Sequence, residues 1–174
     1  MPGVAPLTSF LGTIPDGDAG VKATLRIMVS IVRKFKASLP MITLSRSIVK
    51  SCAAKDYVCE AAALQQYVQQ TIRYTRDVNN VEQVQFPEAT LSMGTGDCDD
   101  MAVLLATLAE SVGFATRFAA VGLSGEGFSH VLAQLLIPGK GWVSAEVIPI
   151  DSQGTQAPLG WYPPEGTTFM LYHV

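Results

Sequence analysis

Two side chains of this sequence supply the nucleophile and the base that covalent catalysis at a carbonyl group needs. Cys98 lies in the segment Gly96-Asp97-Cys98-Asp99-Asp100, where an apolar helical pattern begins. The chain has only two histidines; His130 opens an apolar segment, whereas His173 is next to the last residue. A thiol activated by a nearby imidazole is a frequent nucleophile in acyl transfer. The residue types therefore make Cys98 the candidate nucleophile and His130 its candidate base.

The pattern around Cys98 is that of a helix N-terminus. Cys98, Met101 and Leu105 recur on one helical face. Free backbone N–H groups and the positive end of the helix dipole favour a thiolate there, and the same N–H groups can hold an oxyanion. The negative charge of the flanking acids opposes this activation. Asp97 and Asp100 also have N-cap and N3 spacing, so ordinary helix capping beside a buried apolar cysteine is the competing interpretation.

A carboxylate that orients the imidazole would complete the site. Glu146 lies in an apolar segment, and the turn Pro138-Gly139-Lys140-Gly141 separates it from His130. If this hairpin loop has three or five residues, Glu146 and His130 fall on the same face of the sheet. Asp151 is the rival for the orienting role, and a solvent-facing Glu146 is the alternative.

Helical periodicity dominates the first part of the chain. An arm over residues 1–18 is rich in Pro, Gly and Asp and is expected to be irregular. Residues 75–97 show no sustained periodicity and are expected to form a long loop. The apolar spacing predicts helices over about 19–37, 42–53, 57–74 and 98–112.

Strands are expected in the second part, over 114–121, 128–137, 141–148 and 167–173. Helices followed by strands predict an α+β fold, with a helical N-terminal half and the nucleophile helix packed on an antiparallel sheet. We expect a single domain over residues 19–174 behind the arm over 1–18.

The composition disfavours several functions. The net charge of -3 offers no basic surface for nucleic acid. No apolar run approaches the roughly 20 residues of a membrane span, and the N-terminus lacks the pattern of a secretory signal. We therefore expect a cytoplasmic protein that does not bind membranes. The hydrophobic fraction of 48% supplies one core and leaves room for a homo-oligomer interface.

The cysteines do not indicate a metal site. Cys52 and Cys59 form a C-x6-C pair, and with only two histidines a closed zinc site is not expected. No cofactor is expected. In a reducing cytoplasm all three cysteines would be thiols.

Three segments resemble the transglutaminase-like superfamily of papain-like thiol enzymes, and together they cover about residues 96–148. Ile72-Arg73-Tyr74 also resembles the segment before that family's active-site loop. The chain has Glu146 where the family usually has Asp. The similar segments are Gly96-Asp97-Cys98-Asp99-Asp100 with the later Gly113-Phe114-Ala115-Thr116-Arg117, then Ser129-His130-Val131, and then Gly141-Trp142-Val143-Ser144-Ala145-Glu146.

The resemblance implies a cysteine-dependent amide hydrolase or acyltransferase, of protease, deamidase or transglutaminase type, that acts through a thioester on Cys98. His130 and Glu146 would complete the catalytic group, and the substrate would be a protein or peptide. Tyr74 is a candidate contact for the oxyanion, beside the backbone N–H of Cys98. No metal is needed for this chemistry.

Two other functions stay open. The first is a catalytically inactive member of the family that serves in structure or assembly; compact members with a similar signature occur in bacteriophage and prophage gene sets. The second is a redox or thiol-binding module, which the absence of a C-x-x-C motif disfavours.

Overall fold

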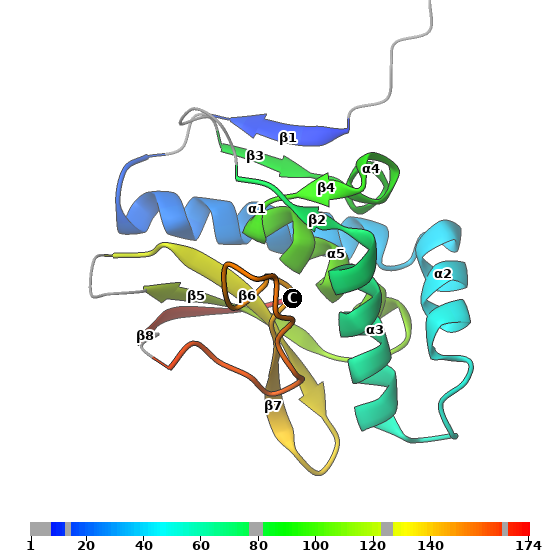
Figure 1. The fold of residues 1–174 in the computed structure, drawn as a ribbon. Helices are drawn as coiled ribbons and strands as arrows, with labels where there is room; N and C mark the ends of the chain where they lie inside the picture. The colour runs from blue at the N-terminus through cyan, green and yellow to red at the C-terminus, as the bar shows by residue number, and fades with distance from the viewer. Residues whose placement is uncertain (1–7, 13–14, 77–81, 123–126, 165–166) are drawn as a thin grey trace, which may run out of the picture.

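The computed structural model describes residues 8–12, 15–76, 82–122, 127–164 and 167–174. It confirms the α+β class: helices fill the N-terminal half, and an antiparallel sheet forms most of the C-terminal half (Figure 1). The helices are α1 (Asp18–Phe35), α2 (Leu39–Val49), α3 (Tyr57–Thr71), α4 (Pro87–Met93) and α5 (Cys98–Ser111). The strands are β1 (Ser9–Gly12), β2 (Arg73–Tyr74), β3 (Glu82–Gln85), β4 (Thr95–Gly96), β5 (Thr116–Gly122), β6 (His130–Ile137), β7 (Gly141–Ala145) and β8 (Thr167–His173).

Helix α5 lies at the centre of the fold. Every residue from Asp100 to Ala109 is buried, because α1, α2, α3 and β6 all pack on this helix (Figure 1). A helix that is apolar on all faces is stable only in such a position. The first residue of this central helix is Cys98, so the core itself fixes the position of the candidate nucleophile.

The large sheet has the strand order β7-β6-β5-β8, and all of its pairs are antiparallel. Strands β6 and β7 join through a three-residue loop, since Ile137 pairs with Gly141. Gly139 and Gly141 take positive φ values of 78° and 80° at this turn, where a side chain would be strained. A loop of three residues is one of the two lengths, three or five, that place His130 and Glu146 on the same face of the sheet.

The segment expected to be a long loop is largely structured, and this prediction was wrong. It contains β3, α4 and β4, elements of two to seven residues that are too short to show a hydrophobic period. Helix α4 has Pro87 in its first turn and ends at Gly94, whose φ of 66° gives a left-handed C-cap.

The arm expected to be irregular contributes a strand, because β1 pairs with β3 in an antiparallel two-stranded sheet. Two helices also differ from their expected bounds. Helix α3 ends at Thr71, and Arg73 and Tyr74 instead pair with β4. Helix α2 begins at Leu39, with the following proline in its first turn.

Cys52 and Cys59 form a disulfide that joins the end of α2 to the start of α3. The expectation that all three cysteines are thiols was wrong for this pair. Spacing alone did not reveal the bond, because it depends on the turn that brings α3 back against α2. Disulfides persist mainly in oxidising compartments, and the cytoplasmic location stays a prediction. Within the described part of the chain, no helix is long and apolar enough to cross a membrane.

Removing this disulfide is expected to destabilise the fold. Closing so short a loop in the unfolded chain contributes about 2 kcal/mol, so Cys52→Ala combined with Cys59→Ala should lower the thermal midpoint by several degrees. Differential scanning calorimetry would measure this, with Cys98→Ala as the control that leaves the bond intact. An unchanged midpoint in the double variant would contradict the bond.

Candidate active site

The loop before α5 is held on both sides of Gly96. Strand β4 pairs in parallel with β2, where Tyr74 lies opposite Gly96, and the N–H of Thr75 donates to the Gly96 carbonyl at 2.9 Å. A Cβ atom at Gly96 would lie 2.8 Å from the Cβ of Asp100, closer than real contacts permit. Glycine at this position is therefore required by the close packing of the loop on the helix.

A capping box begins α5, as the acidic spacing predicted. Oδ1 of Asp97 accepts the backbone N–H groups of Asp99 and Asp100 at 3.0 Å each, and the Asp100 carboxylate accepts that of Asp97. Asp100 is also buried, and its Oδ1 accepts the N–H of Gln85 at 2.7 Å. One carboxylate thus ties β3 to the start of the nucleophile helix, a role that capping alone did not predict.

The environment of Cys98 holds its thiol in the protonated form. Burial raises the pKa of Cys98 well above its usual value, and the charges of Asp99 and Asp97 raise it further. A backbone hydrogen bond from Val131 opposes them, and the thiol donates to Asp99 Oδ1 at 3.5 Å. The expectation of a thiolate at this helix N-terminus was wrong in its net direction, because burial and the adjacent carboxylates raise the pKa of Cys98. The thiol therefore needs a base before it can attack.

Asp99→Asn is expected to speed the alkylation of Cys98 by iodoacetamide at neutral pH by severalfold. The substitution removes a negative charge that raises the pKa of the thiol, so the rise in rate with pH should shift to lower pH. Mass spectrometry of the labelled chain would give the rate for Cys98. The control is Asp151→Asn, which removes an exposed charge; equal rates in both variants would contradict the role of Asp99.

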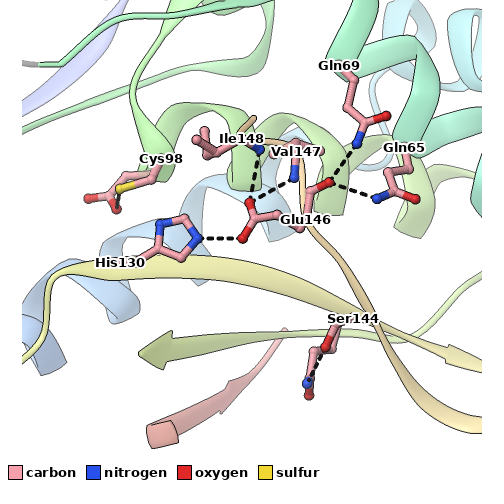
Figure 2. Close-up of polar contacts among 10 residues, drawn as sticks. Gln65, Gln69, Cys98, His130, Ser144, Glu146, Val147 and Ile148 are labelled. Carbon is pink, nitrogen blue, oxygen red and sulfur yellow. Dashed lines mark hydrogen bonds and ion pairs between the residues drawn. The ribbon is translucent and has the colours of Figure 1, made fainter. Parts of the chain in front are cut away.

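His130 and Glu146 form a close pair. His130 Nε2 lies 2.6 Å from Glu146 Oε2, and the Glu146 side chain is only 2% exposed. Figure 2 shows the imidazole between Cys98 and Glu146, with the other ring nitrogen, Nδ1, on the side of the ring nearer Cys98. The structure thus brings the three predicted residues together, with Glu146 against one side of the His130 ring and Cys98 on the other.

Two groups of donors hold Glu146 in place. Its Oε1 accepts the backbone N–H groups of Val147 at 2.9 Å and Ile148 at 3.0 Å. Its backbone carbonyl accepts the side-chain amides of Gln65 and Gln69 of α3, at 2.8 and 2.9 Å (Figure 2). Sequence reasoning missed both glutamines. The available signal was their i, i+4 spacing on the otherwise apolar face of a helix.

The two remaining candidates are Asp151 and Tyr74. Asp151 is exposed and closes its own turn by accepting the N–H groups of Gln153 and Thr155 at 3.0 and 2.9 Å; hydrogen bonds from Thr155 lower its pKa. This geometry favours Glu146 over Asp151 as the partner of His130. Tyr74 is partly buried and packs on the core, and its backbone pairs with Gly96.

Two other features of the structure, a cluster of potential metal ligands and an apolar groove, do not extend the site. Asp97, Cys98 and Asp99 each bring one potential metal ligand within 4.8 Å of the others. The Asp97 carboxylate already caps α5, so we assign no metal there. A groove of about 300 Å³ between β1, α1 and the start of α4 is lined by Phe10, Ile27, Ile31, Phe86 and others. Neither Cys98, His130 nor Glu146 lines it.

A thiol at the first residue of a central helix faces a histidine on an antiparallel sheet, and a carboxylate follows the neighbouring strand. This is the arrangement expected of a papain-like thiol fold. The family model of the transglutaminase-like superfamily matches residues 42–147, more than half of the chain, and this chain belongs to that superfamily. The matched range contains Cys98, His130 and Glu146. No curated protein is significantly similar in sequence.

Solved structures share the fold. A candidate protease from Parabacteroides distasonis is 10% identical, with a TM-score of 0.54 over 80% of this chain and 30% of that one. A candidate cysteine protease from Cytophaga hutchinsonii is 13% identical, with a TM-score of 0.52 over 84% of this chain and 53% of that one. The chain thus spans about a third to a half of these proteins. Family and fold together support a cysteine-dependent enzyme in general.

Proposed function

We propose that the chain is a cysteine-dependent amide hydrolase or acyltransferase that acts on a protein or peptide through a thioester on Cys98. The observation that carries this proposal is the contact of 2.6 Å between His130 Nε2 and the buried Glu146 carboxylate. That contact orients the imidazole. In a neutral ring whose Nε2 donates its proton to this carboxylate, Nδ1 is the nitrogen that can act as the base for the thiol.

The first half of the reaction forms the thioester. Nδ1 of His130 takes the proton of Cys98, and the sulfur attacks the carbonyl carbon of the amide. The Asp97 carboxylate already accepts the N–H groups of Asp99 and Asp100, so the N–H of Cys98 is the donor that we assign to the oxyanion. The C–N bond then breaks, the imidazolium gives its proton to the leaving amine or ammonia, and the acyl group stays on sulfur.

The second half releases the acyl group. Water, or an amine in a transfer reaction, gives a proton to His130 and attacks the thioester carbonyl. The C–S bond breaks, and the imidazolium returns its proton to the sulfur. We place hydrolysis ahead of transfer. The acidic surroundings of Cys98 would favour a cationic acceptor such as a lysine side chain if transfer occurs.

One observation favours the alternative, a catalytically inactive structural or assembly protein. Burial and the charges of Asp99 and Asp97 raise the pKa of the Cys98 thiol, which would suit a cysteine that never ionises. The proposal accommodates this because a general base can remove the proton during attack, with no standing thiolate.

The proposal is tested by incubating the protein with a tryptic peptide mixture and analysing both by mass spectrometry after an acid quench. We expect an acyl adduct on Cys98 that hydroxylamine removes. The peptides should show new termini for a protease, glutamate in place of glutamine for a deamidase, or new isopeptide bonds for a transglutaminase. Cys98→Ala is the control. If several peptide mixtures give no adduct on Cys98 and no altered peptides beyond those of the control, the result would support the inactive alternative.

A further inference from the structure

Two buried glutamines connect α3 to the candidate active site. Gln65 and Gln69 are one helical turn apart and are 2% and 9% exposed. Each Nε2 donates to two carbonyl oxygens, those of Glu146 and Ala157. The distances to Glu146 are 2.8 and 2.9 Å, and those to Ala157 are 3.2 and 2.9 Å. Figure 2 shows both side chains pointing from α3 to the Glu146 carbonyl.

The four hydrogen bonds form a closed set. A side-chain amide has two N–H donors, and a backbone carbonyl accepts two hydrogen bonds. Four donors therefore meet four acceptor positions, and none is left over. A buried polar group without a partner is costly, so this arrangement disfavours any rotation of the peptide groups that carry the two carbonyls.

The peptide group between Glu146 and Val147 is held at both ends. Its carbonyl oxygen accepts the two glutamines, and its N–H, which belongs to Val147, donates to Glu146 Oε1 at 2.9 Å. A peptide group is planar and trans, so fixing the direction of the C=O also fixes that of the N–H. Because the Val147 N–H donates to Oε1 of Glu146, the other carboxylate oxygen, Oε2, contacts His130.

We propose that Gln65 and Gln69 are positioning residues for the His130–Glu146 pair. They orient the peptide group after Glu146 and thereby the carboxylate that holds the imidazole. Because the same amides hold Ala157, they also couple the segment 150–160 to this carboxylate. This inference rests on the proposed function, since it assigns a role to residues that act through His130.

The attachment of α3 does not depend on these glutamines. Its residues Ala61, Leu64 and Val68 are fully buried in the core. The segment 150–160 has a separate attachment, because the N–H of Gly160 donates to the Ser144 carbonyl at 2.8 Å. Positioning and folding can therefore be measured separately.

The test replaces the glutamines with methionine, which is similar in length and has no N–H donor, singly and together. Either glutamine alone still gives each carbonyl one donor, so we expect each single variant to alkylate Cys98 only a fewfold more slowly at neutral pH. The double variant should be slower by about tenfold to a hundredfold, as when outer partners of a site are lost. Iodoacetamide is the probe, and mass spectrometry identifies Cys98.

The matched control is Gln134→Met. Gln134 also donates to β7, to Ser144 Oγ at 3.0 Å, and accepts from Arg117. Side-chain ¹⁵N NMR gives a second readout: the Nε2-protonated tautomer of His130 should lose population in the double variant and keep it in the control. If the double variant does not fold, the two single variants must still shift this tautomer.

Two results separate this inference from the proposed function. The positioning role alone would be overturned if the glutamine variants kept the wild-type rate of Cys98 alkylation and the wild-type His130 tautomer, while His130→Ala still slowed alkylation. Equal rates in wild type and His130→Ala would overturn the proposed function, and the positioning role with it.

Discussion

His130→Ala is expected to slow the alkylation of Cys98 by iodoacetamide at neutral pH by about a hundredfold, the lower part of the range for general bases. Burial, Asp99 and Asp97 raise the pKa of the thiol, so little thiolate exists at neutral pH without a base. Nδ1 of His130 lies on the side of the ring nearer Cys98 (Figure 2) and is the base in the proposed mechanism. The difference in alkylation rate between wild type and His130→Ala should shrink as the pH rises, because hydroxide then takes the proton of the Cys98 thiol.

The control for this prediction is the other histidine. His173 packs edge-on against Trp142, with ring centroids 5.2 Å apart, on the far strand of the sheet. His173→Ala should leave the alkylation rate of Cys98 unchanged. Equal slowing in both variants would indicate a general effect on the sheet rather than the loss of a base.

Glu146→Gln is expected to lower turnover of a peptide that forms the acyl adduct by about 10³- to 10⁴-fold, near the effect of the matching change in a serine triad. The amide keeps the shape of the side chain, and its oxygen can still accept the N–H groups of Val147 and Ile148. Its NH₂ group must then donate to His130 Nε2, which moves the ring proton to Nδ1. An imidazole protonated at Nδ1 cannot take the proton of Cys98.

Glu146→Asp restores the residue that the family usually has and is the conservative control. Its carboxylate keeps the ring proton on Nε2, although the side chain is shorter by one methylene. We therefore expect it to retain far more activity than Glu146→Gln, measured as peptide turnover under the same conditions. Equal activity of the two variants would show that the tautomer of His130 does not govern the reaction.

The sequence predicted the arrangement of the three candidate residues because each signal there was local. The helix start at Cys98 follows from a glycine, an N-cap acid and an apolar period, and all of these lie within a few residues. The face shared by His130 and Glu146 follows from the length of one hairpin loop. Local chemistry and strand alternation therefore sufficed to place three residues that come from one helix and one hairpin.

The sequence did not predict the features that depend on contacts between distant segments. The amides of Gln65 and Gln69 bond to carbonyls about 80 to 90 residues later in the chain. The carboxylate of Asp100 bonds to β3, a strand too short to show a pattern. The raised pKa of the Cys98 thiol also depends on the fold, because burial by the folded core is its largest cause.

The central claim is that Glu146 acts on Cys98 only through His130. A double-mutant cycle on the rate of Cys98 alkylation at neutral pH tests it most directly, with Glu146→Gln, His130→Ala and the double variant. We predict that the double variant is no slower than His130→Ala alone, because the carboxylate has nothing to orient once the imidazole is gone. Slowing by the product of the two single effects would contradict the account.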